Sequence, residues 1–110
     1  NFAFGYKAWA DKVHDEIQKQ TGHPPQQTCA MSYGLNVGQM TALSYHAQLD
    51  VKSVKLESSE LRESDCQWFV VAHDARQEIR HKVNLNQWRH IRIIRRPSDK
   101  REALILYQRR

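Results

Sequence analysis

The chain has 110 residues, a length typical of one domain, and its 40% hydrophobic and 26% charged residues fall within the globular range. No apolar run approaches the roughly 20 residues of a membrane-spanning helix, so we expect no contact with a membrane. Lys and Arg number 17 against 12 Asp and Glu, which gives a formal net charge of +5 and an isoelectric point near 9.5. We expect a single domain over residues 1–110, excised from a longer protein, because the chain begins with Asn1 rather than Met.

The excess of positive charge is concentrated at the end of the chain. From Arg89 to Arg110 there are eight Lys or Arg and two acids, whereas the rest of the chain has nine Lys or Arg and ten acids. Clustered positive charge favours a polyanionic partner, most often nucleic acid, either RNA or DNA. The alternatives are a solvated surface with an Arg-rich edge strand that deters aggregation, and contacts with the rest of a longer parent chain.

The two cysteines, Cys29 and Cys66, lie far apart in the sequence. There is no Cys-x-x-Cys pair and no set of Cys and His residues with zinc-binding spacing, so we expect no metal and no cofactor. We interpret both cysteines as reduced, buried thiols, which favours a cytoplasmic location.

The clearest helix is predicted from Tyr6 to Thr21. Gly22 stands where a helix-ending glycine is expected, and Pro24 and Pro25 prevent continuation. The apolar residues that follow the i, i+3, i+4, i+7 spacing of one helical stripe are Tyr6, Trp9, Ala10, Val13 and Ile17.

Residues 28–56 fit two interpretations. In one, Asn36 caps a helix and Gln39 completes the spacing of a capping box. In the other, Cys29–Tyr33 and Met40–His46 are strands joined through a turn bounded by two glycines. We favour the strands, because Thr, Ser, Tyr and Gly are poor helix formers. Val51–Leu56 alternates in polarity and is predicted as a further strand.

The next segments alternate between polar and apolar character. Glu57–Asp65 holds four of the 12 acids and is predicted as a loop with one helical turn, facing away from a polyanion. Cys66–Ala72 contains an unbroken apolar run, which predicts a central strand buried on both faces. Ile79–Val83 alternates and predicts a half-buried strand, although residues 74–82 also fit a short helix. With turns at 73–75 and 84–87, the second half is expected to be an antiparallel meander.

The chain ends in a predicted β-hairpin over Trp88–Arg110. Its turn is placed at Pro97–Lys100, because Pro97 fixes φ near the value that a type I turn requires. Pairing Arg96 with Arg101 and Arg95 with Glu102 turns one face to the core, namely Ile91, Ile93, Leu104 and Leu106. The opposite face then carries His90, Arg92, Ile94, Arg96, Arg101, Ala103, Ile105 and Tyr107. The sequence therefore predicts an α+β fold, with an N-terminal helix packed on a mainly antiparallel sheet of about four to six strands that ends in a basic β-hairpin.

The basic, aromatic-containing face of this hairpin is the first candidate site. Arginine side chains bind phosphates, His90 can assist them, and the ring of Tyr107 offers a surface on which a base can stack. We therefore expect a nucleic-acid-binding domain. The predicted binding residues are His90, Arg92, Arg96, Lys100, Arg101, Tyr107, Arg109 and Arg110.

A small, metal-independent, toxin-like ribonuclease is the alternative. Such an enzyme needs a base, an acid and a cation that stabilises the transition state. His81 and His90 are the candidate acid and base, and Arg92 is the candidate cation. A further alternative is a protein-interaction module anchored by Trp9, Trp68 and Trp88.

The string from Arg95 to Arg101 resembles the wing tip of MarR-type winged-helix repressors, including an Asp-x-Arg element at Asp99 and Arg101. The resemblance implies a wing that reaches the DNA backbone and minor groove. It is limited to this string, because residues 40–54 match a helix-turn-helix poorly and residues 66–83 are predicted as sheet where that family has helices.

Overall fold

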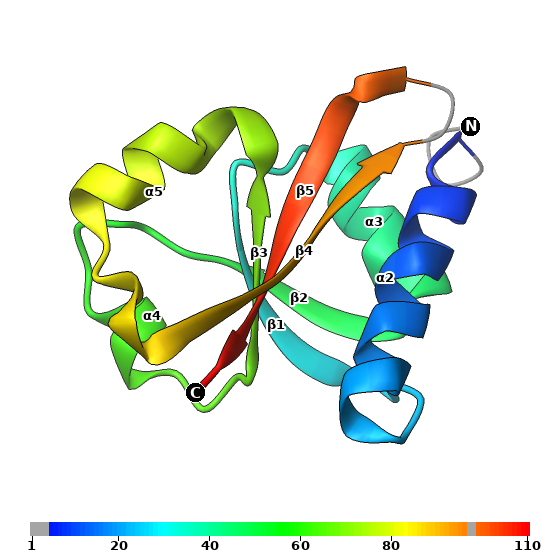
Figure 1. Cartoon of the computed structure of the whole chain (residues 1–110), viewed down its shortest axis with the longest axis horizontal. Helices are drawn as coiled ribbons and strands as arrows, with labels where there is room; N and C mark the ends of the chain where they lie inside the picture. Colours follow the sequence, from blue (N-terminus) through cyan, green and yellow to red (C-terminus); the bar gives the residue numbers. More distant parts are fainter. Residues whose placement is uncertain (1–4, 97–98) are drawn as a thin grey trace.

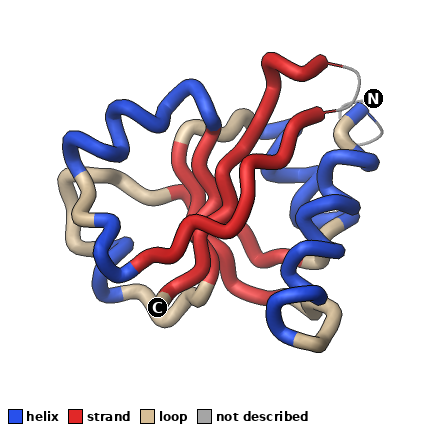
Figure 2. Tube along the Cα trace, in the orientation of Figure 1, coloured by secondary structure: helices blue, strands red, loops and turns tan. Residues whose placement is uncertain are grey.

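A five-stranded sheet lies between two pairs of helices, with α2 and α3 on one face and α4 and α5 on the other (Figure 1, Figure 2). The computed structural model describes residues 5–96 and 99–110, and of residues 99–101 it describes the backbone alone. In chain order the elements are α2 (Lys7–Thr21), β1 (Thr28–Tyr33), α3 (Val37–His46), β2 (Leu49–Ser53), α4 (Glu60–Glu63), β3 (Trp68–Ala72), the 3-10 turn η1 (His73–Ala75), α5 (Arg76–Lys82), the 3-10 turn η2 (Leu85–Gln87), β4 (Trp88–Arg96) and β5 (Asp99–Arg109).

The sheet is mixed. Its strand order is β2-β1-β3-β5-β4, with β1 parallel to β2 and β3, and β5 antiparallel to β3 and β4. The predicted α+β class and N-terminal helix are confirmed, and the five strands fall within the expected number. The expectation of a mainly antiparallel sheet is wrong, because helices connect strands that we predicted to be joined by turns.

Helix α3 replaces the strand predicted at Met40–His46. The Asn36 side chain accepts the backbone N–H of Gln39 at 2.8 Å, and the Gln39 side chain accepts the backbone N–H of Asn36 at 2.9 Å. This capping box satisfies two donors at the helix start and outweighs the weak helix propensity of the following residues. A helical crossover between β1 and β2 makes these two strands parallel.

Helix α5 likewise replaces the strand predicted at Ile79–Val83, and the short-helix alternative is confirmed. Ile79 is the one fully buried residue of this helix. A single inward residue flanked by polar ones satisfies both a helix and a strand pattern over five positions, so the alternation was not decisive.

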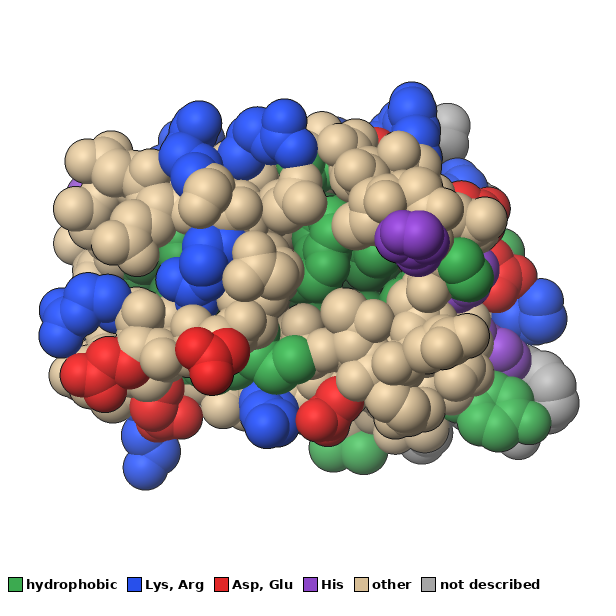
Figure 3. Space-filling model, turned by 90° about the horizontal axis from the view of Figure 1, so that it is seen from below, with side chains coloured by type: hydrophobic (Ala, Val, Ile, Leu, Met, Phe, Trp, Pro, Cys, Tyr) green, Lys and Arg blue, Asp and Glu red, His purple; other side chains and the backbone are tan. Residues whose placement is uncertain are grey.

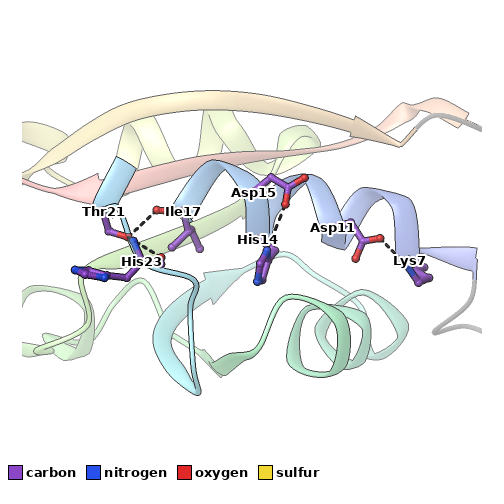
Figure 4. A network of polar contacts seen from close by, with 7 residues as sticks. All are labelled: Lys7, Asp11, His14, Asp15, Ile17, Thr21 and His23. Atoms are coloured by element: carbon purple, nitrogen blue, oxygen red, sulfur yellow. Dashed lines mark hydrogen bonds and ion pairs between the residues drawn. The ribbon is translucent and has the colours of Figure 1, made fainter. Parts of the chain in front are cut away.

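Helix α2 follows its prediction closely. Gly22 adopts a left-handed conformation at φ 79° and donates its N–H to the carbonyl of Gln18 at 2.8 Å, which ends the helix. Polar contacts line the outer side of the helix, including the 2.7 Å ion pair between Lys7 and Asp11 and the contact of His14 with Asp15 (Figure 4).

Two hydrophobic cores fill the layers on either side of the sheet. Trp9 and Trp68 lie in the core under α2 and α3, and Trp88 lies in the core under α4 and α5. All three indoles are at most 3% exposed, so they pack the interior and offer no anchor for a partner protein. The central strand predicted at Cys66–Ala72 is confirmed, because every residue of β3 is buried.

The expectation of two reduced thiols is wrong in this structure. Cys29 and Cys66 form a disulfide, with their Cα atoms 5.0 Å apart, within the usual range for such a bond. Cys29 lies in β1 and Cys66 shortly precedes the neighbouring β3, so the parallel pairing of these strands brings the two residues together. Among the described residues, no helix is long and apolar enough to cross a membrane.

Candidate nucleic-acid interface

The register of the two terminal strands changes at Ile91. Trp88, Arg89 and His90 pair with Arg109, Gln108 and Tyr107, which continues the register that we predicted. A bulge between His90 and Arg92 then shifts the pairing by one residue, so that Ile93 pairs with Ile105 and not with Leu104. The predicted register is therefore wrong from Arg92 onward, and the turn residues Pro97 and Ser98 lie outside the described residues.

This shift divides the predicted basic face between the two sides of the sheet. Arg92 and Ile94 turn toward α2, whereas Ile93 and Arg95 share the other side with His90 and Tyr107. The face that we predicted from a continuous alternation does not exist as one surface. We call the two sides of the edge strand the α2 side and the α5 side of β4.

On the α2 side, three arginines of β4 are engaged by the neighbouring helix and strand. Arg89 donates to the side chains of Gln108 at 2.6 Å and Gln20 at 3.4 Å. Arg92 donates to Glu16 at 3.3 Å, a carboxylate that is only 8% exposed. Such contacts hold α2 against the sheet edge, and the second engages Arg92, a side chain that we predicted to bind phosphate.

Arg96 belongs to a polar cluster at the start of α2. It donates to Glu102 at 2.7 Å and to the carbonyl of Gly5 at 3.0 Å, and its guanidinium lies 4.4 Å from the centre of the Tyr6 ring. Glu102 also accepts from the Tyr6 hydroxyl at 2.8 Å and from Gln39 at 3.2 Å. Burial and then the hydrogen bond to Glu102 raise the pKa of Tyr6. Glu102 neutralises Arg96, so this cluster joins α2, α3 and β5.

Two further predicted binding residues are part of the interior. Tyr107 is 7% exposed and stacks with Phe69, so its ring is not open to a base. Arg109 donates to the carbonyls of Leu61 at 3.1 Å, Ser64 at 2.8 Å and Cys66 at 3.0 Å. Its guanidinium also covers the Trp88 ring at 4.3 Å. Both residues stabilise the fold.

The α5 side of β4 gathers cations in another way. His90 meets the Tyr107 ring edge-on, with centroids 5.7 Å apart, and the positive charge of Arg80 on α5 lies close enough to Tyr107 to oppose the rise that burial causes in its pKa. Further along β4, Arg95 pairs with Ala103 of β5. The neighbouring residue Leu104 pairs with Ala72, the last residue of β3, and His73 follows directly. We name this set the α5–β4 surface, made of His73, Arg76, Arg80, His90, Ile93 and Arg95.

His73 reports the charge of this surface. Burial, then Arg76, then Arg95 lower the pKa of His73, and the carboxylate of Asp74 only partly opposes them. Arg76 donates to the carbonyl of His73 at 3.0 Å, and its guanidinium lies 3.4 Å from Nδ1 of the ring. The sequence does not indicate His73, Arg76, Arg80 and Arg95 as one site, because the alternation at Ile79–Val83 predicts a strand where the structure has α5.

The remaining predicted residues are dispersed. Arg110 is exposed at the chain end, and the side chains of Lys100 and Arg101 lie outside the described residues. His81 is two residues from the buried Ile79, which places it on the solvent side of α5, and no described contact joins it to His90. The structure therefore does not bring His81, His90 and Arg92 together as a catalytic group.

Both signs of charge are present on the face seen from below. Several acidic side chains gather at its lower left with Lys or Arg beside them, and further Lys and Arg side chains lie along its upper margin (Figure 3). Within the described part of the chain, no cluster of His, Cys, Asp and Glu is arranged to hold a metal ion. Comparison with protein-family models, curated proteins and solved structures finds no match for this chain.

Proposed function

We propose that the chain binds nucleic acid, RNA or DNA, through the α5–β4 surface. The observation that carries the proposal is the grouping of His73 with Arg76 and Arg95: Arg76 contacts His73 directly, and burial, then the charge of Arg76, then that of Arg95 lower the pKa of His73. Cations held close together repel one another, and a polyanion laid over them relieves that repulsion. Phosphates are the anions that arginine side chains recognise most specifically.

The arrangement of the surface supports a strand-like ligand. Arg76 and Arg80 stand one turn apart on α5, while His90, Ile93 and Arg95 follow one another on the facing side of β4. Ile93 is 36% exposed and offers an apolar contact for a sugar or base. Arg110, Lys100 and Arg101 lie at the ends of β5 in the sequence and remain candidates for further phosphate contacts.

The two other functions expected from the sequence receive less support. The ribonuclease stays a prediction, because its proposed acid and base do not face one another. The protein-interaction module has less support because the three tryptophans expected to anchor a partner are buried in the two cores. Nucleic-acid binding without chemistry is therefore the function that we put forward.

A salt series tests the proposal. Labelled single-stranded and double-stranded RNA and DNA are titrated with the wild type, with Arg76→Gln/Arg80→Gln and with Lys52→Gln/Lys55→Gln. The last variant is a matched control, because it removes two exposed lysines near the opposite edge of the sheet. For a single strand, loss of two phosphate contacts lowers the slope of log K against log salt by about 1.4.

The control variant is expected to keep the wild-type slope. Absence of salt-sensitive binding to every probe, or an equal loss in both double variants, would reject the proposal. Gel analysis of the RNA recovered from wild type, His81→Ala and His90→Ala checks the ribonuclease. Cleavage that disappears in either His variant would replace binding by catalysis as the function.

The cytoplasmic location expected from the sequence also stays a prediction. A persistent disulfide between Cys29 and Cys66 is typical of oxidising compartments and uncommon in the cytosol. Alkylation in intact cells followed by mass spectrometry measures the state of this pair. An oxidised pair would argue against the cytoplasm.

A further inference from the structure

A cavity of about 210 Å³ opens between α4, the end of α5 and η2. It is lined by the apolar residues Leu56, Leu61, Val83 and Trp88 and by polar residues that include Asn84 and Gln87. The volume is below the usual range for drug-sized ligands, so a small, flat group is the appropriate occupant. Apolar contact together with amide groups suits a planar ring with hydrogen-bonding edges.

The charges around the cavity are close to balanced. Lys82 lines it, but its ammonium donates to Glu57 at 3.2 Å and to Glu78 at 3.4 Å, and these contacts raise the pKa of Lys82. Arg62 at the rim has no hydrogen-bond or ion-pair partner among the described residues. A neutral ring therefore fits the interior better than a phosphate, because the ammonium of Lys82 is already paired with Glu57 and Glu78.

The cavity continues the α5–β4 surface. Helix α5 passes from Arg76 through Arg80 to its end at Lys82, and β4 runs in the opposite direction from Trp88 through His90 to Arg95. Trp88 and His90 share one side of β4, two residues and hence about 6.7 Å apart. Gln87, which lines the cavity and is exposed, precedes Trp88, so a strand whose phosphates follow the cations passes the cavity at Gln87.

We propose that this cavity takes one unstacked nucleobase, so that the α5–β4 surface prefers single-stranded to duplex nucleic acid. The inference rests on the proposed function, because the cations must first bind the backbone. The amide of Gln87, which makes no hydrogen bond within the described chain, reads the edge of the base. In a duplex the base edges are paired and stacked, so the cavity stays empty.

The test measures affinity and the site of contact together. A short single-stranded RNA, the same sequence as a duplex, and free nucleoside monophosphates are titrated with the wild type, Gln87→Leu and Gln18→Leu. The last variant makes the same replacement at an exposed position of α2, on the other face of the sheet. The indole N–H signals of Trp9, Trp68 and Trp88 are followed by nuclear magnetic resonance.

Single-stranded RNA is expected to shift the Trp88 signal and to leave those of Trp9 and Trp68 in place. Gln87→Leu weakens single-strand binding about fivefold, the equivalent of one hydrogen bond, and leaves duplex binding unchanged. Gln18→Leu matches the wild type. A shift with monophosphates but not with the strand would identify free nucleotides as the source of the base and overturn the strand preference.

Failure of this inference is distinguishable from failure of the proposed function. Salt-sensitive RNA binding with an unmoved Trp88 signal, or with equal affinity for strand and duplex, would overturn the base-binding cavity alone. Absence of salt-sensitive binding to every nucleic acid would overturn both proposals.

Discussion

The two sides of strand β4 use arginine for different purposes. On the α2 side, Arg89, Arg92 and Arg96 are held by Gln20, Glu16 and Glu102. On the α5 side, Arg76 donates to the carbonyl of His73, and burial, then Arg76, then Arg95 lower the pKa of that histidine. A count of basic residues in a strand therefore does not reveal which of them hold the fold. The role of each arginine depends on the groups that it contacts, and several of these groups come from elements distant in sequence.

The largest expected effect concerns Arg109, which lies over Trp88 yet bonds only to the backbone through its guanidinium. Arg109→Ala leaves three carbonyl groups without their donor, and we expect the free energy of unfolding to fall by about 3 kcal/mol. Urea denaturation of the variant beside wild type measures the change. If the variant keeps normal stability but no longer binds RNA, Arg109 is a binding residue rather than a residue that stabilises the fold.

Next in size is the contrast between Arg96 and Arg80. Arg96→Ala removes two charge-assisted hydrogen bonds and the contact with the Tyr6 ring, so stability should fall by about 2 kcal/mol. Arg80→Ala should change stability by less than about 0.5 kcal/mol, because an exposed substitution away from a network costs little. Thermal and urea unfolding compare the two variants. Equal losses would erase the distinction between the sides of β4.

A substitution that adds a cation to the α5 side of β4 should increase nucleic-acid affinity. Ile93→Lys adds a cation in the middle of the α5–β4 surface, and one exposed ion pair contributes up to about 1 kcal/mol, or fivefold in affinity. Thr41→Lys adds the same charge to an exposed position of α3 on the other face of the sheet. Fluorescence anisotropy with labelled RNA should show tighter binding for the first variant only. The same gain in both would point to net charge rather than to a site.

The smallest effect is a pH dependence centred on His73. Its pKa is lowered in the folded chain, so the unfolded chain binds the proton more readily and stability falls as pH drops through about 6.5. A phosphate beside Arg76 and Arg95 would raise the pKa of His73. Nucleic-acid affinity should therefore rise as the pH drops through the same range. Both slopes should be weaker in His73→Gln. Affinity that depends on pH identically in wild type and variant would remove His73 from the surface.

Much of the architecture was predictable from local signals. Helix α2 followed from its apolar stripe and from Gly22, and β3 followed from an apolar run that only a central position can bury. Helix α3 is not predicted by the propensity of its residues, because Thr, Ser, Tyr and Gly are poor helix formers; its formation depends on the cap of Asn36 and Gln39. The parallel strands are not predicted for the same reason, since they depend on that crossover helix.

The candidate site was less predictable, because it depends on contacts between distant segments. The signal for α5 was a single buried residue, Ile79, and a pattern of five residues fits two periods. The bulge at Ile91 has no clear signature in the sequence, and yet it decides which arginines face α2. Glu16 and Glu102, which neutralise Arg92 and Arg96, could be assigned only once the helix and the sheet were placed together.

The bulge gives this strand one position at which it can lose a residue. Loss of Ile91 alone would take out the extra residue, so that Arg92 would follow His90 directly and the alternation would become regular. Arg92 and Arg96 would stay on the side of their carboxylates, Glu16 and Glu102. A deletion at Ile91 is therefore a change of length that β4 can accept without exchanging its structural and its ligand-facing arginines in descendants of this domain.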